Sequence, residues 1–223
     1  MENLQTIEDL ITSIHKKQEQ HSTDRPASKF RSINADIKKV RDCLLQCYEE
    51  RVQSRGGGFI PDHQTIMAID YVTVWFFSKK RDGLLLYGRF GTGKTTLLNC
   101  IRRLFLTDRQ SDQVLFITPS TLIRDMNKPN NEGRLFDRCL YGEVVLIDEA
   151  GIEDRSINIW GTKCSPLQEI LVHRYDRQYI TVMATNLDDE GLQSQYGLRV
   201  WDRILESYTR IAYTQDSYRR LNQ

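Results

Sequence analysis

Residues 88–95, with the sequence GRFGTGKT, restrict what this chain can fold into more than any other stretch. They match the phosphate-loop pattern G-x-x-x-x-G-K-[S/T], with an apolar run before them (residues 84–87) and a helical pattern after them (residues 96–106). In a strand, loop and helix of this kind, the backbone N–H groups and the helix N-terminus face the same anion. The sequence therefore predicts a nucleotide-binding protein.

Two side chains of this loop have expected roles in the chemistry. Lys94 is expected to reach the β- and γ-phosphates, and Thr95 is expected to hold Mg²⁺. The residues assigned to nucleotide binding in this part of the chain are Gly88, Arg89, Phe90, Gly91, Thr92, Gly93, Lys94, Thr95 and Thr96.

Composition limits the remaining possibilities. With 223 residues, of which 39% are hydrophobic, the chain can build one sizeable core and a smaller appendage. The 31 lysines and arginines nearly balance the 30 aspartates and glutamates, so any contact with nucleic acid must come from a local patch. The five cysteines show no C-x-x-C spacing. Because no signal peptide or membrane-spanning apolar run is visible, we expect a cytoplasmic protein without membrane contact.

The N-terminal part of the chain is predicted to be helical. Residues 1–20 carry aliphatic side chains at helical spacing, and this amphipathic segment either packs on the domain or docks a partner. A polar connector follows, and a second helix is predicted over residues 34–53 with Asn34 as its cap. We therefore divide the chain into a helical arm and linker (residues 1–55) and a P-loop domain (residues 56–223).

The P-loop domain is predicted to have an α/β fold. A third helix is expected after Asp62, and Phe59 and Ile60 before it either flank a plain hinge or form a wall of the adenine site. From residue 83 onward, apolar runs alternate with helical or polar stretches, which predicts a parallel sheet with helices on both faces. The predicted strands are residues 84–87, 114–118, 144–148, 180–185 and 210–213.

The third of these strands ends in two adjacent carboxylates, Asp148 and Glu149. Asp148 is expected to bind Mg²⁺, and Glu149 is expected to polarise an attacking water. An acidic pair at a strand end is weak evidence alone, but downstream of a phosphate loop it favours nucleotide hydrolysis over passive binding.

Two further polar residues are candidates. Asn186 follows the strand at residues 180–185, and it either hydrogen-bonds the γ-phosphate or the attacking water, or opens a turn. Arg203 lies on a predicted helix whose apolar face is Val200, Ile204 and Leu205. It is either a solvated charge or an arginine donated across a subunit contact. No guanine-reading N-K-x-D follows residue 186, so a GTPase is not expected.

Taken in order, these motifs resemble the AAA+ ATPases. Within them, the chain is most similar to the DnaC/IstB-like branch of replicative helicase loaders and transposition helper ATPases. The resemblance covers roughly residues 59–220. It rests on the phosphate loop and on IDEAG (147–151), HRYD (173–176), TNL (185–187), RIL (203–205) and SYR (217–219).

The resemblance implies roles that the residues alone do not establish. Asn186 would be the sensor, Arg203 the arginine finger supplied to a neighbouring subunit, and Arg219 a sensor-like arginine near the nucleotide. The implied fold is a P-loop three-layer α/β/α domain with a parallel five-stranded AAA+ type sheet, preceded by a helical N-terminal arm and without a C-terminal lid domain. The implied cofactors are ATP and Mg²⁺.

The resemblance also implies partners: a head-to-tail oligomer of this chain, single-stranded DNA, and a replicative helicase or a transposase. Residues 120–140, where this branch carries a DNA-facing insertion, either line a DNA groove or form a solvated loop, because acidic residues balance the basic ones. The basic residues concerned are Arg124, Lys128, Arg134 and Arg138.

We therefore expect an ATPase that loads or positions a replicative helicase on DNA. Three alternatives remain open on the sequence: an IstB-like transposition helper ATPase, a P-loop small-molecule or nucleotide kinase, and an ATP-gated assembly module whose turnover is incidental.

Overall fold

The structure is a computed structural model that describes residues 36–56, 58–78, 83–107, 113–128, 134–159, 161–215 and 218. The predicted amphipathic segment at residues 1–20 and the predicted sensor-like Arg219 lie outside these residues.

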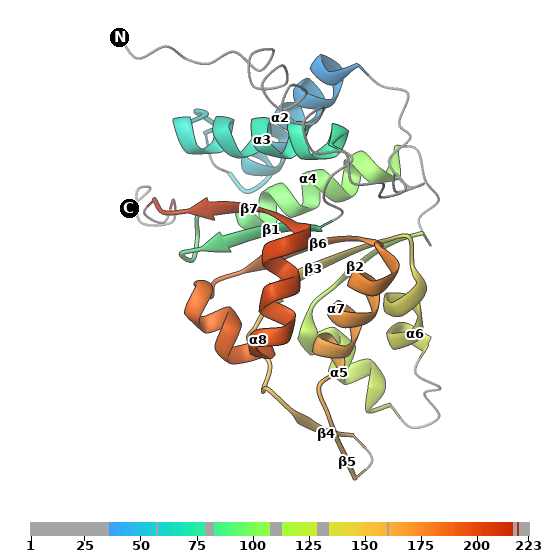
Figure 1. Ribbon diagram of the computed structural model, residues 1–223. Helices are drawn as coiled ribbons and strands as arrows, with labels where there is room; N and C mark the ends of the chain where they lie inside the picture. Colours follow the sequence, from blue (N-terminus) through green and yellow to red (C-terminus); the bar gives the residue numbers. More distant parts are fainter. Residues whose placement is uncertain are drawn as a thin grey trace, which may run out of the picture.

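The centre of the fold is a five-stranded sheet in which every neighbouring pair is parallel (Figure 1). Its spatial order is β2-β3-β6-β1-β7, which confirms the predicted α/β class with a five-stranded parallel sheet. All five predicted strands are present, and β7 begins two residues earlier than predicted. The strands are β1 (Gly83–Gly88), β2 (Val114–Ile117), β3 (Val144–Ala150), β6 (Ile180–Thr185) and β7 (Tyr208–Tyr213).

Helices cover both faces of this sheet, as the continuous apolar strands predict. Each face buries its own apolar cluster, and every fully buried aliphatic side chain there contributes about 1.5–3 kcal/mol. On one face lie α2 (Ile37–Gln53), α3 (His63–Phe77) and α4 (Lys94–Leu106). On the other lie α5 (Pro119–Met126), α6 (Arg134–Tyr141), α7 (Pro166–Arg177) and α8 (Asp189–Ser207).

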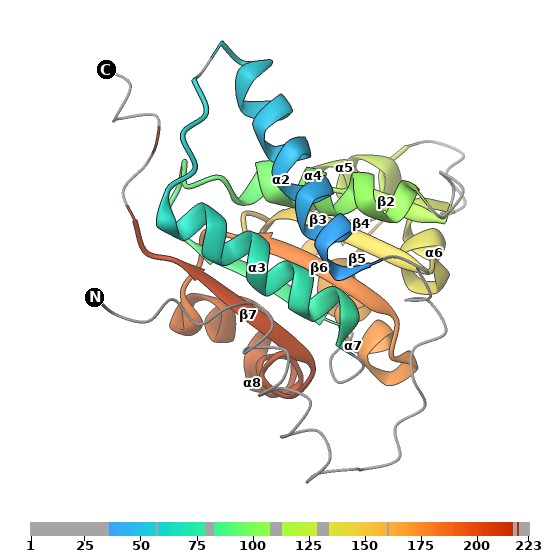
Figure 2. The same cartoon turned by 90° about the horizontal axis from the view of Figure 1, so that it is seen from above.

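Helix α2 packs across α3 and α4, as the view from above shows (Figure 2). Its buried residues Leu44 and Cys47 belong to the same apolar cluster as α4 and the sheet. The predicted boundary after residue 55 therefore falls between two helices that share one core. Helix α2 begins at Ile37 with Asp36 as its N-cap, which accepts from the Lys38 N–H at 3.2 Å, so the prediction of Asn34 as the cap was wrong.

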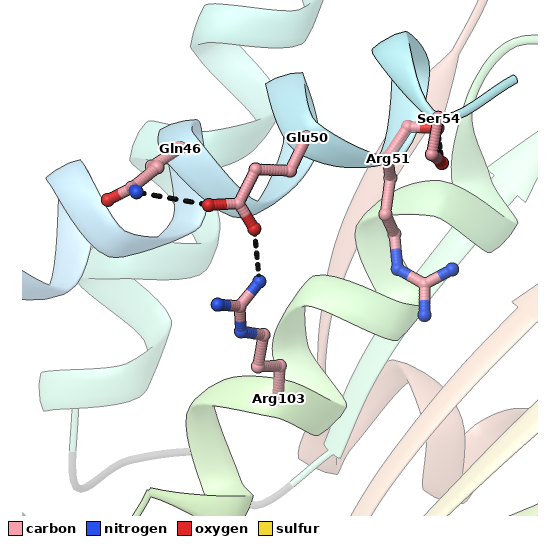
Figure 3. Close-up of polar contacts among 5 residues, drawn as sticks. All are labelled: Gln46, Glu50, Arg51, Ser54 and Arg103. Atoms are coloured by element: carbon pink, nitrogen blue, oxygen red, sulfur yellow. Dashed lines mark hydrogen bonds and ion pairs between the residues drawn. The ribbon is translucent and has the colours of Figure 1, made fainter.

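Polar contacts hold α2 to α4 along their exposed side (Figure 3). Glu50 of α2 accepts a hydrogen bond from Gln46 (3.0 Å) and forms an ion pair with Arg103 of α4. The next residue of α2, Arg51, donates to Asn99 of α4 at 3.1 Å, and Asn99 lies one turn before Arg103. These contacts connect α2 to the helix that follows the phosphate loop.

Two features of the other face were not predicted. A two-stranded antiparallel hairpin, β4 (Ile157–Ile159) and β5 (Thr162–Cys164), projects from the domain between β3 and α7 (Figure 1). Arg174 of α7 is 1% exposed, and it donates to the carbonyl oxygens of Cys139, Gly142 and Ile180 at 2.6–2.8 Å. Among the described helices, none is both long and apolar enough to span a bilayer.

Candidate functional site

The phosphate loop connects β1 to α4, as the motif requires. Gly93 is the N-cap of α4 and has a φ of 94°, in the left-handed region that favours glycine. A Cβ atom at this position would also lie 2.1 Å from the Tyr48 hydroxyl oxygen of α2. The loop is therefore in close contact with α2, and the last glycine of the motif is required by both its backbone angle and its surroundings.

Lys94, the first residue of α4, folds back over the loop. Its ammonium group donates to the carbonyl oxygens of Gly88 (2.7 Å) and Arg89 (2.5 Å). Burial lowers the pKa of Lys94 to about 8, although the nearby Asp148 carboxylate opposes the shift. A cation that is poorly hydrated and surrounded by loop carbonyls is well placed to bind an anion in the same loop.

Thr95 and Asp148, the two predicted Mg²⁺ ligands, lie together. The Thr95 hydroxyl donates to Asp148 Oδ1 at 3.2 Å, and the Glu149 N–H donates to the same oxygen at 3.0 Å. Burial raises the pKa of Asp148 above its usual value and outweighs these two hydrogen bonds, which stabilise the carboxylate. A hydroxyl and a carboxylate oxygen suit Mg²⁺, which needs few protein ligands when phosphate and water complete its shell.

Glu149 sits at an irregularity of the sheet. The pairing of β3 with β6 shifts in register between Ile147 and Ala150, and Glu149 has a φ of 57°. A non-glycine residue in this region is strained, and such strain concentrates at functional sites. The side chain of Glu149 is exposed at the carboxyl edge of the sheet, where a predicted general base would meet its water.

Asn186 directly follows β6, the strand between β1 and β3. It therefore lies at the same sheet edge, between the strand that leads into the phosphate loop and the strand that carries Asp148. The preceding Thr185 fixes this edge: its hydroxyl donates to the Ala150 carbonyl (2.6 Å) and accepts from the Leu187 N–H (3.1 Å). The ends of β3 and β6 are thus held together beside Asn186.

Tyr218 brings the C-terminal segment onto the phosphate loop. Its backbone N–H donates to the Gly91 carbonyl at 3.1 Å, and its hydroxyl donates to Asp62 at 2.7 Å and lies 2.9 Å from the Thr65 hydroxyl. The residue next to Arg219 is therefore anchored at the loop, although Arg219 itself is outside the described residues.

The remaining predicted contacts of the nucleotide site lie around the start of α4. The buried Thr96 accepts a hydrogen bond from Arg55 at 3.4 Å, Thr92 is buried, and Phe90 is exposed. Phe59 packs against Tyr48 with ring centroids 5.7 Å apart, whereas Ile60 is 89% exposed.

Arg203 of α8 is bound within its own chain. Its guanidinium lies 3.2 Å from Asp176 of α7 and 4.7 Å from the centroid of the Tyr175 ring, and its side chain is 16% exposed. Val200 and Ile204 are buried as predicted, but Leu205 is 38% exposed, so its assignment to the buried face was wrong. Leu205 follows Ile204 by one residue and points about 100° away around the helix.

The predicted basic residues of the 120–140 segment lie on two helices. Arg124 and Lys128 are exposed at the end of α5 and just after it, and Lys128 forms an ion pair with Asp125 at 2.9 Å. Arg134 and Arg138 are exposed on α6.

Sequence reasoning missed two residues beside the site, Glu153 and Tyr196. Their side chains are hydrogen-bonded at 2.8 Å although they are separated by 43 positions in the chain. No local pattern indicates such a pair, because the contact depends on how α8 folds back onto the end of β3.

Comparisons with known proteins agree with this fold. No family model matches the chain. The replicative helicase loader DnaI of Bacillus subtilis (strain 168) is 23% identical over 130 residues, which cover 57% of this chain. The match spans only 40% of that relative's length.

Solved structures with the same fold include DnaI, with a TM-score of 0.54 and 22% identity, covering 70% of this chain and 88% of that one. The DnaC helicase loader has the same TM-score with 18% identity, and the match covers 70% of this chain and 93% of that one. DnaA from Aquifex aeolicus bound to AMPPCP has a TM-score of 0.50 with 16% identity, covering 69% of this chain and 48% of that one. The predicted resemblance to the DnaC-like branch of AAA+ ATPases is confirmed.

Proposed function

We propose that this chain is a Mg²⁺-dependent ATPase that loads or positions a replicative helicase on DNA. The observation that carries the ATPase assignment is the meeting of Lys94, Thr95 and the Asp148–Glu149 pair at one edge of the sheet. The similarity to helicase loaders supports the biological role.

The residues have distinct parts in this reaction. Lys94 binds the β- and γ-phosphates, and Thr95 and Asp148 would hold Mg²⁺, which would supply positive charge beside the phosphates. Glu149 orients and polarises the attacking water, and Asn186 hydrogen-bonds the water or the γ-phosphate. We assign Phe59, which packs against Tyr48, and the exposed Ile60 to the apolar wall that an adenine ring needs.

Three further parts of the proposal concern partners. The chain forms a head-to-tail oligomer in which Arg203 reaches the neighbour's nucleotide, and Arg219 contacts the nucleotide in its own subunit. Single-stranded DNA binds along the exposed cations of α5 and α6, and residues 1–25 dock the helicase. These assignments rest on the resemblance and on the exposure of Arg134 and Arg138.

Two substitutions test the enzymatic proposal. Glu149→Gln should retain binding of a fluorescent ATP analogue but lower kcat by roughly 10²–10⁴, the usual contribution of a general base. Lys94→Ala should weaken nucleotide binding itself. Binding by equilibrium fluorescence and phosphate release are measured on the same preparations. Unchanged turnover in Glu149→Gln would remove Glu149 as the base, and transfer of phosphate to an acceptor other than water would indicate a kinase.

The loading role requires a separate assay. Transfer of a replicative helicase onto circular single-stranded DNA should depend on this chain and on ATP. The Glu149→Gln variant should bind the helicase but stall in the ATP-bound state. A helicase that loads equally well without this chain would contradict the proposed role.

A further inference from the structure

The carboxylate of Glu153, four residues after Glu149, is hydrogen-bonded through both oxygens. One oxygen accepts from the Gly151 N–H at 2.9 Å, and the other accepts from the Tyr196 hydroxyl at 2.8 Å. The Glu153 carbonyl also accepts from the Gln195 side chain at 2.7 Å. This side chain therefore joins the backbone just after Glu149 to helix α8.

The Tyr196 end of this connection is in the protein interior. Tyr196 is 3% exposed, and burial together with the charge of Glu153 raises its pKa, so the hydroxyl keeps the proton that it donates. The cavity beside the pair has a volume of about 10 Å³, at the lower limit for a single water. This space is too small for a ligand, so the contact joins two parts of the protein itself.

The other end of the connection is the bend that carries Glu149. Glu149 has a φ of 57°, and Thr185 of β6 holds the bend from one side by donating to the Ala150 carbonyl at 2.6 Å. Glu153 holds it from the other side through the Gly151 N–H. A strained backbone persists only where its surroundings fix it. These two contacts, together with the Asp148 carboxylate that accepts from the Glu149 N–H at 3.0 Å, support the bend from side chains.

Helix α8 consists of two segments joined at Gly197. Gly197 has φ 81° and ψ 161°, a conformation essentially restricted to glycine, which interrupts the helix. The first segment includes Gln195 and Tyr196, which bind Glu153, and Ser194, which contacts Arg155. The second segment carries Arg203, held against α7. The hydrogen bonds that run from the Glu149 bend through Glu153 therefore reach α8 at Tyr196, the residue directly before Gly197.

We propose that Glu153 is a positioning residue: it fixes the Glu149 bend and, through Tyr196, couples the nucleotide state of the site to the α8 segment that carries Arg203. This proposal rests on the ATPase function proposed above. When the γ-phosphate binds or leaves beside Glu149, the Gly151 N–H moves with the bend. Glu153 transfers that movement to Tyr196, and the second segment of α8 reorients about Gly197.

Trp201 is a natural reporter for this movement. It lies on the second segment of α8, four residues after Gly197 and two before Arg203, and its ring is 5.5 Å from the Arg210 guanidinium. The chain contains three tryptophans. Labelling with 5-fluorotryptophan gives one fluorine resonance for each of them, and single Trp→Phe variants assign the resonances without a probe being added to the site.

The experiment compares the wild type with Tyr196→Phe and Glu153→Ala, with and without a slowly hydrolysed ATP analogue and Mg²⁺. In the wild type the analogue should shift the Trp201 resonance. In both variants the shift should be lost, whereas affinity for the analogue should stay within about twofold of the wild type. The kcat should fall by roughly 10- to 100-fold, since a displacement of about 1 Å of a catalytic group can cost about 100-fold.

Controls separate this coupling from a merely structural contact. Tyr71→Phe removes a hydroxyl from the exposed face of α3 and should retain the Trp201 response. Thermal unfolding of each variant confirms that the domain is folded under the conditions of the measurement. The double variant Glu153→Ala with Tyr196→Phe should show no further loss of kcat beyond Glu153→Ala alone, because both changes interrupt the same connection.

The outcomes are distinguishable. A Trp201 shift that persists in Tyr196→Phe with unchanged kcat would overturn the coupling. A wild type that binds and hydrolyses ATP without any Trp201 shift would also overturn it, while the proposed ATPase function would stand. A wild type that does not bind the analogue would overturn the proposed function and the coupling with it.

Discussion

Single side chains at the phosphate loop combine structural and chemical roles. Lys94 donates to two carbonyl oxygens of its own loop, so its position is set before any ligand binds. Burial disfavours the charged form of Lys94 more than the nearby Asp148 carboxylate favours it, so the pKa of the ammonium group is lowered to about 8. The protonation state of Lys94 therefore changes within the pH range of ordinary biochemical experiments.

Nucleotide affinity should consequently depend on pH. Phosphate favours the charged form of Lys94, and the free protein loses that charge as the pH rises through about 8. The dissociation constant for an ATP analogue should increase about tenfold between pH 7 and pH 9, because only the protonated lysine binds well. Equilibrium titration with a fluorescent analogue at constant Mg²⁺ measures this. The Lys94→Arg variant, which stays charged, should give a flat profile, and an equal slope in both proteins would assign the titration to another group.

The residues HRYD at positions 173–176 show how one short motif serves two purposes. Arg174 donates to backbone carbonyls near the starts of β3 and β6, so it holds the sheet together from within. Asp176 and the ring of Tyr175 instead hold Arg203 of α8. The sequence indicated a family likeness at these positions, but not these contacts, because the partners are distant in the chain.

At the scale of elements, α8 is a helix with a non-helical residue, Gly197, in its interior. Its interruption at Gly197 leaves open space where a Cβ atom would lie, so a side chain meets no steric obstacle. The constraint comes from the backbone angles alone.

Gly197→Ala should therefore destabilise the protein in spite of that space. A left-handed, extended backbone costs a non-glycine residue about 1–3 kcal/mol, and the free energy of unfolding should fall by this amount. Chemical denaturation followed by circular dichroism measures the change. The matched control is Arg199→Ala, an exposed position two residues further along the same helix, which should stay within about 0.5 kcal/mol of the wild type. Equal stability of Gly197→Ala and the wild type would mean that the segments can join as a continuous helix.

The elements that sequence predicted well are those with strong local signals. The five strands are long apolar runs, and the phosphate loop has a fixed pattern of glycines, so both were found at nearly their observed positions. The β4–β5 hairpin was missed because its strands have only three residues each and its second strand is polar. The cap of α2 was misplaced because Asn34 and Asp36 are both good capping residues and sequence does not separate them.

The candidate site divides in the same way between residues with a local sequence signal and contacts that have none. The sequence placed Lys94 and Thr95 in the phosphate loop, and it placed Asp148, Glu149 and Asn186 at the ends of parallel strands, so it could predict that these residues share one edge of the sheet. The contacts of Glu153 with Tyr196 and of Tyr218 with Gly91 were not predictable, since each joins segments that meet only in the folded molecule.

At the scale of the whole molecule, Arg203 connects the fold to the proposed assembly. Within one chain its charge is balanced by Asp176, and to act on a neighbour's nucleotide it must leave that ion pair. ATP turnover by the assembly should therefore depend on Arg203.

Light scattering with and without a slowly hydrolysed ATP analogue should show assembly of the wild type. Addition of a single-stranded oligonucleotide should give co-assembly. Arg203→Ala should lower ATP turnover in the assembled state by roughly 10³–10⁵, the range known for arginine fingers. Arg199→Ala, on the same helix, serves as the charge-matched control. A monomer under every condition, with turnover indifferent to Arg203, would contradict an oligomeric ATPase.

The position of β1 has a consequence for how the protein is made. This strand leads into the phosphate loop, yet both of its neighbours, β6 and β7, are synthesised after it, and Tyr218 reaches Gly91 later still. Domains begin to fold while the ribosome is still extending the chain. Until residues 180–213 have been translated, neither of the two strands that pair with β1 in the folded sheet has been made. A nascent chain interrupted before that point carries the whole GRFGTGKT sequence but not the sheet that supports it.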